Sequence, residues 1–310
     1  MHPYKNGSAL LSALFIMTLV AIVATAMSTR LQLDIYKTRM LVTQDKLTLA
    51  SESVLFWAFS ELQHIKKFTS ATSDGLIKQY PESLKHLYPD VLTEGALYDL
   101  QSKINLNNLT EKKSIALFVN FFSYLYPDLP DDTLLQLVLT LQDWLSNYDL
   151  SKGKDEYMSY YTTQKPPYFP SHQRMVSRSE FRLLKHVNDA LDHKIQRFLI
   201  ALPESTPINI NTAPKAVLMA LGDGLTEHQA DELIEQRGVN GFKKTDVLSP
   251  LLQKLNIPNE QVTLKSRYFM SRATVQSSDF KKNIYVILKR EKNKKGKVTL
   301  SVIKQSVEVY

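Results

Sequence analysis

The chain has 310 residues, 44% hydrophobic and 22% charged, a composition typical of a folded protein rather than a disordered one. It contains no cysteine, which excludes disulfides, thiolate catalysis and cysteine-ligated zinc. The net charge of +7 does not indicate a generally basic surface, because residues 281–310 alone carry nine basic and two acidic side chains.

The N-terminal segment predicts a helix that begins in a membrane. Residues 8–29 contain no charged side chain, and Arg30 ends the run. At about 1.5 Å per residue, a helix of this length crosses a hydrocarbon core of roughly 30 Å. A cleaved secretory signal has a shorter apolar core, about 7–15 residues. No glycine or proline interrupts residues 30–63, so we expect a membrane-spanning half (8–29) continued by an amphipathic soluble half (30–65). A plain signal anchor is the alternative.

A short leader (1–7) ending in Gly7, an apolar run and a continuous helix together resemble the type IV pilin and pseudopilin precursors. The resemblance implies that prepilin peptidase cuts between Gly7 and Ser8, and that the subunit then enters a helical filament. Most members carry a Glu at the fifth residue after the cut, where this chain has Ser12. An unpaired carboxylate in lipid is costly. The absence of this Glu resembles the K-type minor pseudopilin of type II secretion, which sits at the filament tip with no subunit above it.

The next stretch predicts a strand followed by a polar turn. Residues 97–106 alternate as in a strand, and the run Asn105-Leu106-Asn107-Asn108-Leu109 follows it directly. This run resembles a K-type motif of the form N-L-N-N-L. We expect its asparagines to make turns and to cap a helix that begins near Thr110.

Residues 114–145 have helical periodicity, broken at Pro127 and Pro130, and the second helix starts at Asp131. The following acidic loop resembles the calcium-binding loop of the K-type family. That resemblance gives calcium as the expected ion, with these ligands: Asp143, Asp149, Asp155 and Glu156.

The loop also departs from that family. Ser146 and Asn147 stand where carboxylates are expected, and Lys152 and Lys154 bring positive charge. The alternative is a polar loop in which a lysine pairs with the acids in place of an ion. The spacing does not fit an EF-hand.

A helix is predicted over residues 177–198. A motif then reads Ile208-Asn209-Ile210-Asn211-Thr212-Ala213-Pro214, followed by helices at 215–221, 226–237 and near 245–255. We expect Thr212 to be an N-cap, Pro214 to lie in the first turn, and Gly222 to adopt a positive φ.

This stretch resembles the I-N-x-N-T-A-P segment of K-type pseudopilins. It also resembles the helix-hairpin-helix of DNA-binding proteins, in which the turn, here Gly222 to Gly224, holds a phosphate. Residues 206–262 carry five basic and seven acidic side chains, and Asp223 lies in the turn itself. Because these charges repel DNA, we interpret the hairpin as a packing unit and expect no nucleic-acid partner.

Residues 268–275, 283–289 and 298–309 have the period of strands. The basic turn Lys292–Lys297 is interpreted as a solvated hairpin tip, with an anionic partner as the alternative. The predicted fold class is α+β: a pilin-like long helix on a small antiparallel sheet (66–106 and 263–310), interrupted by a large helical domain (107–262). That domain divides into 107–205, with the acidic loop, and 206–262.

No catalytic motif is present, so we do not expect an enzyme. The resemblance to K-type minor pseudopilins implies a bacterial inner-membrane, single-pass protein with a periplasmic head. It implies as partners the I-type and J-type minor pseudopilins in a tip complex, the inner-membrane assembly platform and prepilin peptidase. The alternatives are a membrane-anchored helix-hairpin-helix DNA receptor and a minor pilin of a type IV pilus.

Overall fold

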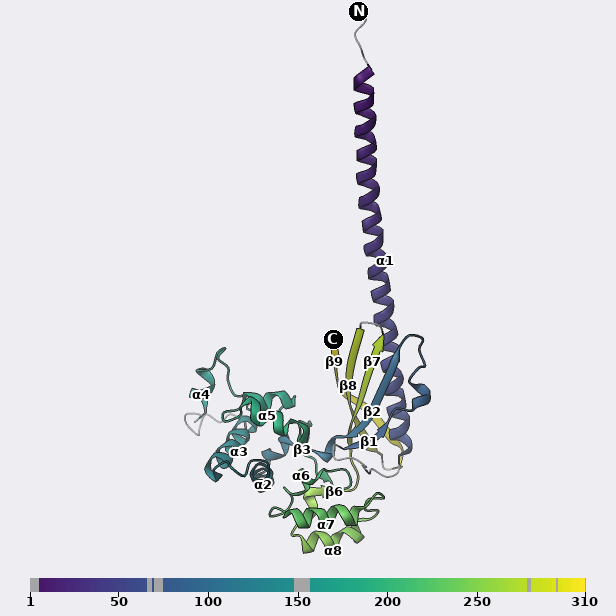
Figure 1. Ribbon diagram of the computed structural model, residues 1–310. Coiled ribbons are helices and arrows are strands. Elements are labelled where there is room, and N and C mark those ends of the chain that lie inside the picture. The colour runs from purple at the N-terminus through teal and green to yellow at the C-terminus, as the bar shows by residue number, and fades with distance from the viewer. Residues whose placement is uncertain are drawn as a thin grey trace, which may run out of the picture.

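The computed structural model describes residues 6–65, 69, 75–147, 157–277, 280–293 and 295–309. Helix α1 (Asn6–His64) is continuous over 59 residues and projects far beyond the rest of the molecule (Figure 1). Its N-terminal half is apolar, exposed, and long enough by length and composition to cross a membrane. The long helix predicted from the sequence is therefore present.

Five strands form one antiparallel sheet in the order β1-β2-β7-β8-β9. Strand β2 pairs with β7 from Leu92 opposite Gln276 to Asp99 opposite Phe269. The chain therefore leaves the sheet after β2 and returns in the adjacent strand, so that the whole insert projects from one point of the sheet. The strands are β1 (Leu76–Gln79), β2 (Leu92–Asp99), β7 (Tyr268–Ser277), β8 (Phe280–Lys292) and β9 (Val298–Val309).

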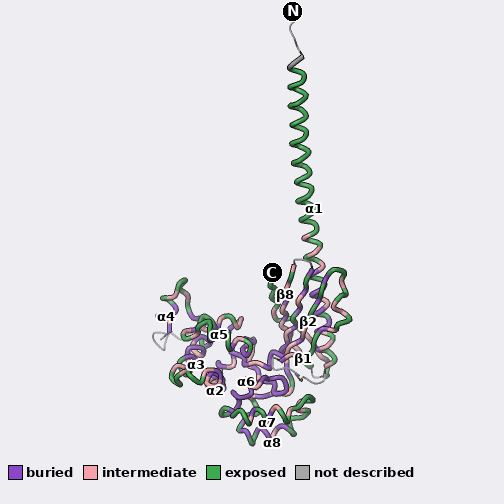
Figure 2. Tube along the Cα trace, viewed as in Figure 1, coloured by how far each residue is buried: buried purple, intermediate pink, exposed green. Residues whose placement is uncertain are grey.

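The C-terminal half of α1 covers the sheet. Val54, Ala58 and Leu62 are fully buried in a cluster with apolar side chains of β2, β7 and β8, including Leu97, Phe269 and Leu288. Leu33 and Tyr36, apolar residues of the predicted amphipathic half (30–65), are exposed, because this part of α1 extends beyond the sheet (Figure 2). Residues 31–39 are therefore a part of the predicted amphipathic half that no described part of the head covers.

Close packing of α1 on the sheet depends on Gly95 in the middle of β2. A Cβ at this position would lie 2.4 Å from Cγ1 of Val54 and 3.1 Å from Cβ of Tyr80. Only a residue without a side chain lets the helix approach the strand this closely.

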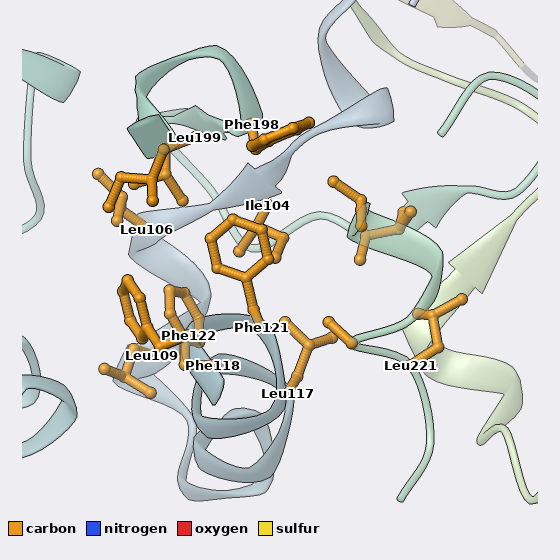
Figure 3. Close-up of a cluster of buried hydrophobic side chains, with 14 of the residues drawn as sticks. Ile104, Leu106, Leu109, Leu117, Phe118, Phe121, Phe122, Phe198, Leu199 and Leu221 are labelled. Atoms are coloured by element: carbon orange, nitrogen blue, oxygen red, sulfur yellow. The ribbon is translucent and has the colours of Figure 1, made fainter. Parts of the chain in front are cut away.

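The first part of the insert packs around a group of phenylalanines (Figure 3). Phe121 makes an edge contact with Phe198 at 6.0 Å between ring centroids, and Phe122 stacks on Phe181 at 6.3 Å. These contacts join α2 to the 3-10 helices Arg178–Leu183 and Gln196–Phe198 later in the insert. The elements are α2 (Ile115–Leu125), α3 (Asp131–Leu145), α4 (Met158–Thr162), α5 (Asp189–Ile195), and the short parallel pair β3 (Ile104–Asn105) and β4 (Leu199–Ile200).

The second part of the insert contains α6 (Lys215–Leu218), α7 (Glu227–Arg237) and α8 (Thr245–Lys254), with the short parallel pair β5 (Ile208–Asn209) and β6 (Val262–Thr263). One hydrophobic cluster runs from Ile104 through α2 and α3 to Leu248 and Val262. The two parts of the insert therefore share a core.

The structure corrects the expected helix over residues 177–198. A 3-10 helix covers Arg178–Leu183, with a capping box between Ser177 and Glu180, and α5 begins only at Asp189. Between them His186 has a φ of 71°, in the left-handed region that interrupts a right-handed helix. Asn188 then accepts a hydrogen bond from the backbone N–H of Leu191 and caps the new helix.

Candidate functional site

The root of the insert is organised around Asp99, the last residue of β2, whose side chain is fully buried. Its Oδ1 accepts a hydrogen bond from the backbone N–H of Gln101 at 2.8 Å. Its Oδ2 accepts three more, from Thr212 Oγ1 at 2.6 Å, Ser266 Oγ at 2.6 Å and Asn209 Nδ2 at 2.8 Å. One carboxylate thus holds three separate stretches of the chain.

Burial raises the pKa of the Asp99 carboxyl above its ordinary value, and the four hydrogen bonds oppose that rise. Every polar partner donates, so the geometry matches a carboxylate acceptor. Removing a donor or the acceptor would leave a buried polar group unsatisfied.

This arrangement corrects the predicted role of Thr212. Pro214, not Thr212, is the N-cap residue of α6, so it precedes the first turn rather than lying inside it. The Thr212 hydroxyl instead donates to Asp99 across the root of the insert. Sequence reasoning did not identify Asp99 or Ser266, because a lone polar residue at a strand end gives no sign of its distant partners.

The remaining polar residues of this motif hold the α7–α8 connection. Asn211 accepts from the backbone N–H of Phe242 at 2.8 Å and donates to the Phe242 carbonyl at 3.1 Å. Arg237, at the end of α7, donates to the carbonyls of Ala213 at 2.8 Å and Ile210 at 3.2 Å. The motif is therefore a buried structural joint.

The Asn105–Leu109 motif makes a second buried joint. Asn107 is fully buried, donates to the carbonyls of Met175 and Leu202, and accepts from the Met175 N–H. Asn105 accepts from the Leu202 N–H at 3.0 Å and donates to the Glu204 carbonyl at 2.8 Å. Asn105 also caps a 3-10 helix over Leu106–Thr110, whereas the α-helix expected near Thr110 begins at Ile115.

Glu204, next to this motif, forms a polar cluster with side chains at the start of β7 and in β8. Its Oε1 accepts from Tyr268 Oη at 2.6 Å and lies 3.2 Å from Arg267 Nη1 and 3.3 Å from Lys289 Nζ. Burial raises the pKa of the Tyr268 hydroxyl to about 12, and the hydrogen bond to Glu204 adds to that rise. The cluster is a further contact between the insert and the sheet.

The acidic loop lies mostly outside the described residues. Asp149, Asp155 and Glu156 belong to the segment 148–156, which the structure does not describe, and Asp143 lies in the last turn of α3. Calcium takes six to eight oxygen ligands, so the one placed carboxylate does not by itself form a site. No group of three metal-ligating side chains occurs among the residues that are described.

Both ends of that loop rest on an aromatic base. Trp144 precedes the loop and makes edge contacts with Tyr161 at 5.5 Å and Tyr168 at 6.5 Å, both of which follow it. His172 Nδ1 lies 3.2 Å from the carbonyl oxygen of Ser146. The two ends are therefore held close together, whatever the loop binds.

The backbone N–H groups of the two glycines in the hairpin donate to protein acceptors. Gly222 has the predicted positive φ, 59°, and its N–H donates to Gln261 Oε1 at 2.9 Å. The N–H of Gly224 donates to the Leu221 carbonyl at 3.1 Å. Lys215, the nearest cation in sequence, lies 2.9 Å from Asp231. These groups already have protein partners, which fits the predicted packing role of the hairpin.

The predicted processing site lies at the start of α1. The Gly7–Ser8 bond is in its first turn, and the Ser12 hydroxyl donates to the Ser8 carbonyl at 2.9 Å. The Ser12 hydroxyl, which stands where the resemblance implies a carboxylate in most pilins, is thus hydrogen-bonded within its own helix.

The chain resembles known proteins over most of its length. Two family models, both described as "Type II secretion system (T2SS), protein K", match residues 102–204 and 208–265. Protein K of Aeromonas hydrophila is 26% identical over 320 residues, covering 94% of this chain and 95% of the relative. Protein K of Klebsiella pneumoniae is 25% identical, with 82% of each chain covered.

Protein K of Pseudomonas aeruginosa is 28% identical over 210 residues, a region that spans 64% of this chain and 61% of the relative. A solved structure, the GspK-GspI-GspJ complex from enterotoxigenic Escherichia coli, contains a chain with the same fold. Its TM-score is 0.70 at 19% identity, with 88% of this chain and 99% of that chain covered.

The two matched regions leave only residues 205–207 between them. The first contains Asn105 and Asn107, and the second contains Asn209, Asn211 and Thr212. Together with the nearly full-length relatives, they show that this chain belongs to the protein K family of minor pseudopilins of type II secretion systems.

Proposed function

We propose that this chain is the tip subunit of the pseudopilus and that it forms a complex there with I-type and J-type minor pseudopilins. The solved relative of the same fold is in a complex with GspI and GspJ. In this role prepilin peptidase removes residues 1–7, α1 anchors the subunit in the inner membrane, and the head lies in the periplasm. The complex then starts filament assembly on the inner-membrane platform.

The observation that carries this proposal is the placement of the insert. It leaves the sheet at Asp99 and returns at Tyr268, and α7 and α8 lie at the end of the molecule opposite to the N-terminus (Figure 1). In a filament whose subunits point their α1 helices toward the membrane, this position is where the head of a further subunit would stack. The insert therefore favours a terminal place.

The N-terminus supports the same place. A carboxylate in lipid needs a partner charge, which other pilins find in a neighbouring subunit. Ser12 needs none, because its hydroxyl bonds within α1. We expect Ser12→Glu to give no increase in secretion, and a clear increase would remove this support.

Gold-labelled antibody to the insert tests the position in overproduced pseudopili. We expect label at one end of each filament. Label repeated along the filament would contradict a terminal subunit and would fit the alternative of a subunit within the shaft.

We also propose that the acidic loop binds calcium through Asp143, Asp149, Asp155 and Glu156. The aromatic base under Trp144 brings the ends of the loop together, which lowers the entropy lost when an ion orders it. Lys152 and Lys154 repel a cation, so the expected affinity is in the weak range of extracellular calcium modules, a Kd of about 10⁻⁴–10⁻³ M.

A further inference from the structure

A groove lies between the N-terminal end of α8 and the β6 region, in the second part of the insert. Its volume is about 470 Å³. Apolar side chains, including Leu248, Leu252 and Val262, form part of its wall. Three lysines from two separate stretches also line it: Lys243, Lys244 and Lys265.

The charges in this groove are unbalanced. Lys243, Lys244 and Lys265 are exposed, and within the described residues none has a carboxylate within ion-pair distance. Asp246 is the one acid in the lining. Lys244 is the N-cap residue of α8 but makes no side-chain capping bond, so the positive end of the helix faces the same region. The groove therefore has an excess of positive charge.

Two of the most exposed apolar side chains of the head lie in the same stretch of sequence. Val239, in the α7–α8 connection, is 88% exposed, and Val247, in the first turn of α8, is 66% exposed. Val239 precedes the lining residues 242–246 in sequence, and Val247 stands between the lining residues Asp246 and Leu248. Exposed apolar side chains around such a stretch are typical of a surface that another protein covers.

We propose that this groove, with its three lysines and the two exposed valines that lie next to its lining residues in sequence, docks an acidic peptide segment of another protein that also carries apolar side chains. The lysines would meet carboxylates, and the groove wall and valines would meet the apolar residues. Figure 1 shows α8 at the end of the molecule opposite to the N-terminus, so the groove belongs to the part of the head that is far from the membrane-spanning half of α1.

The surroundings favour a short acidic segment over a long polyanion. Helix α7, whose Glu232 pairs with Lys254 of α8, also carries Glu227, Asp231 and Glu235, and these acids would repel a nucleic-acid backbone running across both helices. A lipid surface is also disfavoured, because the membrane-spanning half of α1 is at the far end of the molecule. Docking at this surface is a function in addition to the proposed filament role, and it does not depend on the position of the subunit in the filament.

Fluorescence anisotropy on the full-length protein in detergent tests this surface, with a short labelled peptide in which Glu and Leu alternate. We expect saturable binding that weakens as salt rises. The triple variant Lys243→Gln, Lys244→Gln, Lys265→Gln should bind roughly tenfold more weakly, as expected for the loss of three exposed ion pairs. Val239→Ser with Val247→Ser should bind about fivefold more weakly.

The matched control removes the same charge from the exposed β8–β9 turn, with Lys292→Gln, Lys295→Gln and Lys297→Gln, and should bind as the wild type does. Equal binding by the two triple variants would overturn the proposal. The proposal would also be overturned if a DNA duplex or phosphatidylglycerol vesicles bound more tightly than the peptide and the groove variant abolished that binding. If the groove variant fails to fold by thermal denaturation, Lys265→Gln alone takes its place. Co-assembly with other pseudopilins is measured separately, so the two proposals can fail independently.

Discussion

The hydroxyl of Thr212 donates a 2.6 Å hydrogen bond to the buried carboxylate of Asp99, although 113 positions separate the two residues in the sequence. Asn209 and Ser266 donate to the same oxygen. One acceptor therefore joins the end of β2 to the second part of the insert and to the segment that leads into β7, so Asp99 contributes to the orientation of the insert on the sheet.

Replacing Asp99 by Asn should destabilise the protein strongly. The Asn amide cannot accept from all four donors, and one of its N–H groups must face another donor. We expect a loss of roughly 2–4 kcal/mol in the free energy of unfolding, measured by denaturant titration. Asp90→Asn is the control, because Asp90 is exposed and its φ of 62° suits Asn. Equal stability of the two variants would show that the joint contributes little.

Gly95→Ala should loosen the packing of α1 on the sheet. The added methyl group would lie 2.4 Å from Cγ1 of Val54, so the helix or the strand must shift. We expect a loss of about 1–3 kcal/mol in the free energy of unfolding. Val54→Ala opens space at this contact, so the double variant should be more stable than the sum of the single effects predicts. Strict additivity would mean that the two positions do not compete for space.

The Glu204 cluster predicts a dependence on pH. Burial of the Glu204 carboxyl acts to raise its pKa, but hydrogen bonds from Tyr268 and Lys289 outweigh it, and the net pKa falls below the ordinary value of 4.5. A lowered pKa in the folded state contributes stability above the unfolded pKa and loses it as pH falls through the folded pKa.

Glu204→Gln should therefore be less stable than the wild type at neutral pH, and the difference should shrink as pH falls below 4.5 and through the lower pKa of the folded state. Thermal midpoints measured across this range test it. Tyr268→Phe, which removes one donor and keeps Lys289, should show a smaller effect in the same window. A difference that persists unchanged at acidic pH would assign the effect of Glu204 to packing rather than to its charge.

The regular elements could be predicted because their patterns are local. The period of apolar residues in α3 and β9 gives the bounds that the structure has, Asp131–Leu145 and Val298–Val309. The role of Asp99 could not be predicted, because its partners lie more than a hundred residues away. The helix break at His186 could not be predicted, because the apolar pattern continues across it. The basic groove could not be predicted either, because it exists only when folding brings Lys265 beside α8.

Calcium should stabilise the protein if the acidic loop binds it. We expect about 1 mM calcium to raise the thermal midpoint, and Asp143→Asn combined with Asp149→Asn to remove that rise. Asp128→Asn, in an exposed turn before α3, is the matched control and should keep it. An unchanged midpoint of the wild type with calcium would contradict the proposal and favour a loop in which Lys152 or Lys154 pairs with the acids.

The most direct test of the tip role is native mass spectrometry after co-expression of the full-length chain with prepilin peptidase and the I-type and J-type minor pseudopilins. The account predicts a complex with one copy of each subunit, in which this chain begins at Ser8. Recovery of this chain alone, or of assemblies that contain several copies of it in series, would contradict it.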